Sequence, residues 1–331
     1  MGERLSPMRS TVGRSHPIAS RLQGYGLVAL GAALWGSLGL FYQVVIGRYG
    51  LTSLETVFWR ALIASGVLAL LLARRDPGAL RVARRDLGLM ALLGAVGVAA
   101  TFWIYAYAIR AVGMGVAAVL QYVAPVWVTL FSVCFWGERI AATRMAALVL
   151  AVAGVALVGR IWDLQGTHLS LLGIAAALAT SLTYAAYVLL IKMASGRGYG
   201  SGTILLYGLC IGTLCLAPLQ TRQSLNVVFG QPGVIPWLIA LGVVTLAAGL
   251  SFNAGLKHVP ASNASIVATI EPLTAMLLGR SVLNERLEFL QVIGALCILA
   301  AVSVLQIRSR RRTSRSFGQF EEQNIAPNKG T

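Results

Sequence analysis

The pair Glu271-Pro272 places a carboxyl group beside a helix-breaking residue within one apolar stretch, residues 262–283. If that stretch is a helix, Glu271 lies about 13 Å from its start, near the centre of a membrane. A carboxyl group at that depth is costly and normally faces a partner or a cavity. Pro272 removes a helix hydrogen bond, and Pro125 does so in an earlier stretch. Paired interruptions of this kind point towards a substrate site.

Two roles are open for Glu271. In the functional hypothesis, its carboxyl group contacts a cationic group of a substrate or carries a coupling proton. In the structural alternative, it hydrogen-bonds backbone groups that the prolines leave without helix partners. The sequence does not decide between them.

Other residues at intermediate depth are candidates for the same site. Trp35, Trp127 and Tyr184 lie too deep for an interfacial aromatic belt, so we expect them to line a cavity or to pack between helices. Uncharged polar side chains are also candidates to orient a substrate, with hydrogen bonding between helices as the alternative: Gln121, Tyr122, Thr245 and Thr269. Asn253 and Asn263 lie nearer the helix ends and are candidates for an inner gate.

The sequence offers no chemistry for a cofactor or a metal. Four cysteines lie in apolar stretches without a CxxC pair, and the three histidines are scattered. HExxH, GxSxG and the phosphate-binding GxxxxGK[ST] loop are all missing. We therefore predict neither cofactor nor metal. A membrane enzyme or a receptor remains as an alternative from another class.

Composition predicts that these residues sit in a membrane. The 331-residue chain is 57% hydrophobic and 11% charged, with a mean hydropathy of +0.76, whereas a soluble domain carries about twice that charge fraction. Ten apolar runs are long enough to be helices that span a bilayer: 24–47, 53–73, 87–109, 114–136, 142–159, 170–192, 201–219, 234–256, 262–283 and 289–307. The first run is too long for a cleaved signal peptide.

Charge predicts the orientation. The net charge of +16 comes mostly from chain ends and short gaps between runs, which leaves no basic face for nucleic acid. Of the 27 Lys and Arg residues, 20 fall on one side of the predicted bundle and six on the other. Because basic loops stay inside, both termini are predicted to be cytoplasmic. Residues 1–20 and 308–331 are predicted to be disordered basic tails.

Several residues are expected at the outer interface. Arg60 falls inside the run 53–73, and its five-residue spacing from Glu55 does not suit a helical ion pair. Its long side chain is therefore expected to extend outward to the interface. Trp103, Tyr105 and Tyr107 near the outer end of the third run favour an aromatic belt over a gate.

The sequence repeats itself after 147 residues. This shift places Pro125 on Pro272 and Glu138-Arg139 on Glu285-Arg286, which we expect to be solvated pairs at helix ends. The halves are 21–165 and 166–307, with five runs each. An odd number of helices per half requires opposite orientations, so the sequence predicts two inverted repeats. Secondary transporters use this organisation, with the substrate between the repeats.

These motifs resemble the EamA-type branch of the drug/metabolite transporter superfamily. The resemblance covers residues 24–307 and is carried by Glu271-Pro272 running to Asn284-Glu285, and by Pro125 running to Gly137-Glu138. Arg60 and Trp35-Gly36 also fit. It implies ten helices and the export of amino acids or other metabolites.

We therefore predict an all-α integral membrane protein that moves small metabolites by alternating access across a bacterial-type inner (plasma) membrane. Its partners are a small solute and the bilayer, not nucleic acid, and it acts as a monomer or homodimer. Amino acids suit one central carboxylate with aromatic walls, and lipophilic cationic drugs suit the same residues. Sugar nucleotides suit them less, since no basic cluster lies at mid-membrane.

Overall fold

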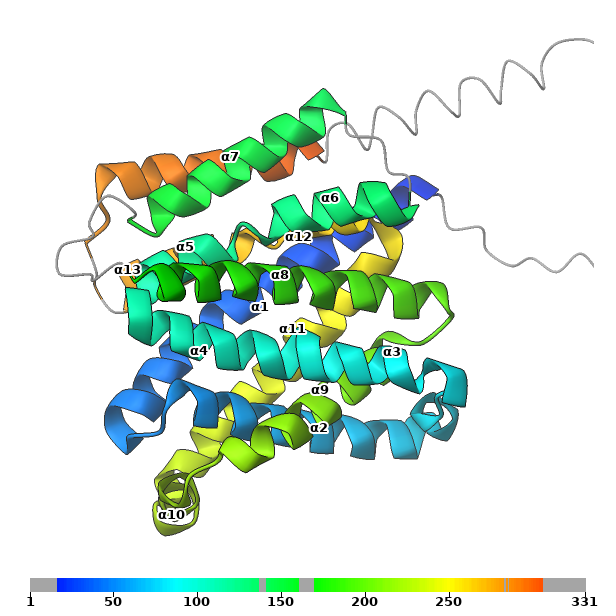
Figure 1. The fold of residues 1–331 in the computed structure, drawn as a ribbon, viewed down its shortest axis with the longest axis vertical. Helices are drawn as coiled ribbons and strands as arrows, with labels where there is room; N and C mark the ends of the chain where they lie inside the picture. The colour runs from blue at the N-terminus through cyan, green and yellow to red at the C-terminus, as the bar shows by residue number, and fades with distance from the viewer. Residues whose placement is uncertain (1–16, 137–140, 161–169, 283, 285, 306–331) are drawn as a thin grey trace, which may run out of the picture.

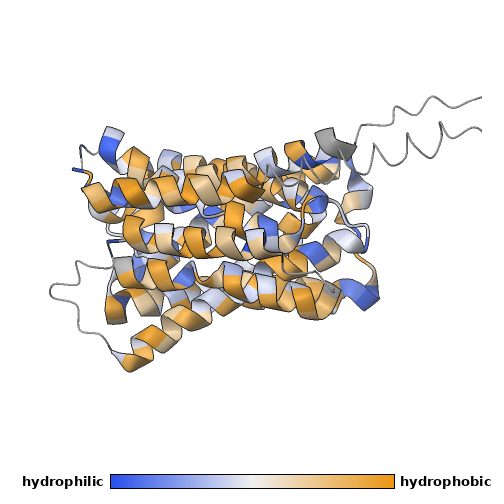
Figure 2. Ribbon diagram, turned by 90° about the horizontal axis from the view of Figure 1, so that it is seen from above, coloured by the Kyte–Doolittle hydropathy of each residue, from blue (hydrophilic) through white to orange (hydrophobic). Residues whose placement is uncertain are grey.

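A computed structural model describes residues 17–136, 141–160, 170–282, 284 and 286–305. Within these ranges, eight helical segments are long and apolar enough to cross a membrane: Ser20–Tyr49, Ser53–Arg75, Arg84–Val112, Val116–Phe135, Leu171–Gly196, Ser201–Leu219, Pro232–His258 and Ala261–Val282. Two further apolar helices, Ala142–Val158 and Phe289–Leu305, are shorter. The protein is thus all-helical across the described residues, with polar residues mostly towards the two ends of the bundle (Figure 2).

The first half of the chain begins with α1 (Pro17–Tyr49) and α2 (Ser53–Arg75). A third segment follows in three parts, α3 (Leu87–Leu92), a π-helical stretch (Leu93–Ala100) and α4 (Thr101–Val112). We refer to these parts together as the third helix. The fourth segment is broken into α5 (Met114–Gln121) and α6 (Ala124–Trp136), and α7 (Ala142–Val158) follows.

The second half follows the same order. Its long helices are α8 (Leu171–Gly196), α9 (Ser201–Leu216) and α11 (Ile235–His258), with a short helix α10 (Arg222–Gly230) before α11. The next segment is again broken, into α12 (Ala261–Val267) and α13 (Ile270–Val282). The helix Phe289–Leu305 packs beside α7 (Figure 1).

Some expectations differ from the structure or fall outside it. The helix α1 already begins at Pro17, so the expected tail of residues 1–20 is shorter by its last four residues. N-terminal residues before Pro17, the tail 308–331, Glu138 and Glu285 lie outside the described residues.

Each half packs on the other in the same way. The helix α1 lies against α11, and α8 lies against the third helix, which holds the corresponding place in the first half. Close approach requires glycine at both contacts: a Cβ at Gly24 would meet His258 and Val259, and one at Gly173 would meet Ala111 and Val112. The contacted residues are 147 apart, which is the repeat in the sequence.

Polar contacts tie the helix ends together at both ends of the bundle. At one end, which we call the α8–α9 end, Arg197 and the Tyr199 hydroxyl both bond the Asp86 carboxylate. The hydrogen bond to Asp86 raises the pKa of Tyr199. At the other end, the α10 end, the Glu55 carboxylate accepts hydrogen bonds from Thr52 and Thr221.

Candidate functional site

Both helices that contain a central proline are broken at the expected positions. The breaks fall between α5 and α6, and between α12 and α13. Pro272 has no N–H to donate to the Ala268 carbonyl, and the Glu271 N–H donates there instead, at 3.0 Å. The backbone therefore closes this gap with its own tighter turn, and the Glu271 side chain is left for other contacts.

Tyrosines from three other helical segments surround the Glu271 carboxyl group. The Tyr122 hydroxyl, at the α5–α6 break, lies close enough to the carboxyl group to interact with it. Tyr105 of α4 and Tyr184 of α8 lie close enough to interact with it electrostatically. All four residues are only half-buried. A carboxyl group inside a membrane-spanning bundle that keeps exposed surface can contact a solute.

Two buried polar atoms, one beside the α5–α6 break and one on α8, have no hydrogen-bond partner among the described residues. They are the Tyr184 hydroxyl and the Gln121 side-chain oxygen. A buried polar atom without a partner costs about 1–3 kcal/mol. Such atoms are therefore available to a ligand.

Arg60 points into the bundle, and the expectation that its side chain extends outward is wrong. It is only 5% exposed, and its Nη1 donates a hydrogen bond to Thr245 Oγ1 of α11 at 2.9 Å. Its guanidinium lies 5.0 Å from the ring centroid of Phe102 and 5.9 Å from that of Tyr42. These aromatic faces and the threonine offset part of the cost of burying the charge. The guanidinium also attracts the Glu271 carboxyl group electrostatically.

Aromatic rings link α8, α1 and α11 beside this centre. The Trp35 ring centroid lies 5.0 Å from that of Phe252 and 6.5 Å from that of Tyr187. Tyr187 in turn lies 6.2 Å from Tyr184. Trp35 is half-buried, so this row of rings offers an apolar wall close to the tyrosines around Glu271.

The structure brings some of the sequence candidates together and separates others. Tyr122 and Tyr184 lie at Glu271, Thr245 holds Arg60, and Trp35 joins the aromatic row. Trp127 instead donates its Nε1 to Ser181 at 2.9 Å and fastens α6 to α8. The Thr269 hydroxyl donates to the Ile266 carbonyl at 2.7 Å inside the helix break.

Sequence reasoning missed Arg60, Tyr105, Tyr187 and Phe252 as members of the centre. For Tyr105 the helical period carried a signal. Trp103 and Tyr107 are four residues apart and share a face, where they are 57% and 46% exposed. Tyr105 lies between them and faces the other way, towards Glu271. The expected belt therefore holds only two of the three rings.

The bundle is tightly packed between this centre and the α8–α9 end. Every residue of α12 is buried, and the Asn263 amide donates to the Tyr25 hydroxyl of α1 at 2.6 Å. The Asn253 amide contacts the Ser201 carbonyl at 3.5 Å. Both asparagines therefore join helices on the α8–α9 side of the centre.

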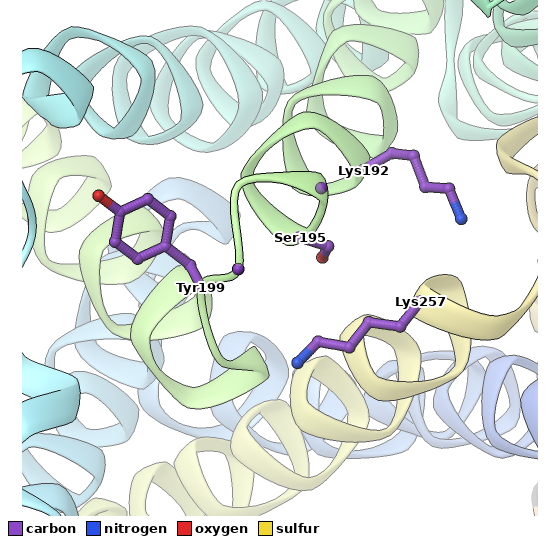
Figure 3. A pocket seen from close by; sticks show the side chains of 6 residues that line it. Lys192, Ser195, Tyr199 and Lys257 are labelled. Carbon is purple, nitrogen blue, oxygen red and sulfur yellow. The ribbon is translucent and has the colours of Figure 1, made fainter.

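A separate pocket of about 330 Å³ lies at the α8–α9 end itself (Figure 3). Its lining includes Lys192, Ser195, Tyr199 and Lys257, and none of the residues around Glu271. The Lys192 ammonium donates to the Leu256 and Val259 carbonyls, both at 2.7 Å. Lys192 thus links α8 to the C-terminal end of α11. Among the described residues, no three of His, Cys, Asp and Glu gather as metal ligands.

Long apolar helices, two of them broken beside a polar centre, define a multi-pass membrane protein. The model of the EamA-like transporter family matches residues 22–160 and 171–306. The chain therefore belongs to the EamA-like transporter family. It is a transporter rather than an enzyme, and its substrate is a small molecule.

Known relatives cover most of the chain. An uncharacterized transporter of Archaeoglobus fulgidus is 34% identical over 85% of this chain and 95% of its own. The threonine/homoserine exporter RhtA of Escherichia coli K12 is 27% identical over 89% of this chain and 94% of its own. A probable terminal-alkyne amino-acid exporter of Streptantibioticus cattleyicolor is 25% identical over 88% of this chain and 97% of its own. A solved crystal structure shares the fold, with a TM-score of 0.70, 18% identity, and coverage of 88% of this chain and 98% of the other.

Proposed function

We propose that this protein is a secondary transporter that exports amino acids or related compounds by alternating access. The observation that carries the proposal is the half-buried Glu271 at a helix break, close to Tyr122, Tyr105 and Tyr184. A carboxylate in that position can hold an ammonium group that water would otherwise solvate. Two of the relatives bear the names of amino-acid exporters, which favours this substrate class and this direction.

The proposal includes the arrangement in the membrane. Ten helices cross the cell's inner (plasma) membrane as two inverted five-helix repeats, residues 21–165 and 166–307, with both termini cytoplasmic. The matching contacts of Gly24 and Gly173 support a two-fold relation between the halves. The α8–α9 end is the cytoplasmic end, where the tight packing around α12 closes the path from the centre. The proposal includes either a monomer or a homodimer as the transporting unit.

Exchange transport in proteoliposomes tests the proposal. Liposomes that hold the full-length protein are loaded with amino acids, lipophilic organic cations and sugar nucleotides, and mass spectrometry identifies what leaves. We expect selective release of amino acids, with a loss of at least about tenfold in Glu271→Gln because one charge-assisted contact is removed. The matched control is Glu288→Gln, since Glu288 pairs with Arg160 outside the centre.

Each outcome has a defined meaning. Release at the native rate by Glu271→Gln would assign the carboxyl group a structural role and remove the central argument. Selective release of lipophilic cations would favour the second candidate, a drug exporter, which the row of rings at Trp35, Tyr187 and Phe252 supports. Failure of folded, inserted protein to release any of the three classes would contradict the proposal.

A further inference from the structure

Arg60 supplies a second charge to the centre, and no carboxylate among the described residues is in direct salt-bridge contact with it. The described residues contain no salt bridge to Arg60, with 4.0 Å as the limit between nitrogen and oxygen. Its Nη1 donates to Thr245, and the guanidinium lies 5.9 Å from the ring centroid of Tyr42. Its Nε is buried and has no hydrogen-bond partner within the part of the chain that the structure describes. A buried guanidinium in this condition is receptive to an anion.

The carboxylate nearest in sequence does not neutralise it. Glu55 is one helical turn and a half away on α2, but its oxygens accept hydrogen bonds from Thr52 and Thr221 at the α10 end. Glu271 attracts the Arg60 guanidinium electrostatically, yet the two groups are not in salt-bridge contact. The positive charge from α2 and the negative charge from α13 therefore lie near one another without direct pairing.

We propose that Arg60 and Glu271 together recognise the zwitterionic head group of a free amino acid, which rests on the function proposed above. The Arg60 guanidinium binds the α-carboxylate, and the Glu271 carboxylate binds the α-ammonium with the tyrosines around it. The substrate's carboxylate supplies the direct salt-bridge contact that Arg60 lacks among the described residues. A planar guanidinium suits a carboxylate because it can donate two parallel hydrogen bonds.

The inference restricts the substrate class. A lipophilic cation brings an ammonium group for Glu271 but leaves Arg60 unpaired, and a simple carboxylic acid does the reverse. Either one should be discriminated against, because a site that is built to pair a charge rejects an analogue that lacks the partner. The row of rings through Trp35, Tyr187 and Phe252 is placed to contact the substrate's side chain.

The test compares three compounds with one side chain. L-phenylalanine carries both charges, L-phenylalaninamide carries only the ammonium, and 3-phenylpropionate carries only the carboxylate. L-leucine and L-threonine are measured with their amides and deaminated acids in the same way. Each compound competes for exchange of the corresponding amino acid in proteoliposomes that hold the full chain. In the native protein, we expect the amide and the acid to compete at least about tenfold more weakly than the amino acid.

The variants assign each charge to its residue. Arg60→Gln should weaken competition by the amino acid about tenfold or more. It should leave competition by the amide within about twofold of the native value, because the amide has no carboxylate to bind Arg60. Retained competition by the amide also shows that this variant is folded. Glu271→Gln should weaken competition by the amino acid and competition by the amide to the same extent. Arg48→Gln is the matched control, because Arg48 also lies over a tyrosine ring, 5.8 Å from its centroid, but on the surface.

Failure of the inference and failure of the proposed function give different results. If amino acids exchange but the amide competes equally well with native protein, the zwitterion site is refuted and the exporter stands. If Arg60→Gln weakens competition by the amino acid and by the amide equally, and Arg60→Lys restores both fully, Arg60 is a positioning residue instead. If no amino acid exchanges, the proposed function fails and the inference fails with it.

Discussion

Replacing Gly36 with alanine tests whether the centre depends on the close approach of α1 to Glu271. A Cβ at residue 36 would lie 2.4 Å from the Glu271 carbonyl oxygen and 2.9 Å from Thr274 Cβ, where ordinary contacts begin at 3.4 Å. The helices α1 and α13 must therefore separate by roughly 1 Å. Overpacking of this kind costs about 1–3 kcal/mol. The better helix propensity of alanine offsets about 1 kcal/mol of this loss of stability.

The expected result for Gly36→Ala is a small loss of stability and a large loss of transport. The two terms leave a net destabilisation of at most about 2 kcal/mol, which thermal unfolding in detergent would measure. Amino-acid exchange in proteoliposomes should fall by at least about tenfold, because Glu271 moves relative to Tyr122 and Arg60 by a distance that disturbs a bound solute.

Gly39→Ala is the matched control on the same helix. Residue 39 is exposed, and a Cβ there would meet no atom within 4 Å. It gains the same helix propensity without the clash, so exchange should stay at the native rate. If Gly36→Ala unfolds at the same temperature as Gly39→Ala and transports at the native rate, the role given to this approach is refuted.

Two further predictions concern contacts outside the centre. Trp127→Phe removes the hydrogen bond to Ser181 and should lower stability by about 1 kcal/mol with exchange within about twofold; a tenfold slower exchange at native stability would place Trp127 at the substrate. Lys192→Met leaves two carbonyls at the C-terminal end of α11 without their donor and should cost about 2–3 kcal/mol in thermal unfolding. Lys257→Met, at an exposed position, is its control, and equal stability of the two variants would contradict the role of Lys192.

The helical architecture was accessible from the sequence because each apolar run carries its own evidence. A long run without charges forms a membrane helix whatever its neighbours are. The helix breaks were accessible for the same reason, since Pro125 and Pro272 act on their own helices. The repeat of 147 residues also anticipated a structural fact, because Gly24 and Gly173 contact equivalent residues.

The side of the helix that a residue occupies was harder to read. Thr56 and Ser65 share the buried face of α2 with Arg60, but a few polar residues in an apolar run did not by themselves show that this face turns inward. The partners of Arg60 come from three other helices: Tyr42, Phe102 and Thr245. Only their arrangement makes the interior a better environment for the guanidinium than the interface.

The sequence by itself determined which segments are helical and apolar and where two of them break, and it predicts the depth of Glu271 in the membrane. These properties depend on composition, on proline and on the rise of a helix, all of which are local. The tertiary structure alone decided that Arg60 of α2, Tyr122 at one break, Tyr184 of α8 and Glu271 at the other break share one centre. Such a meeting depends on how distant helices pack and rotate against one another, and no single helix encodes it.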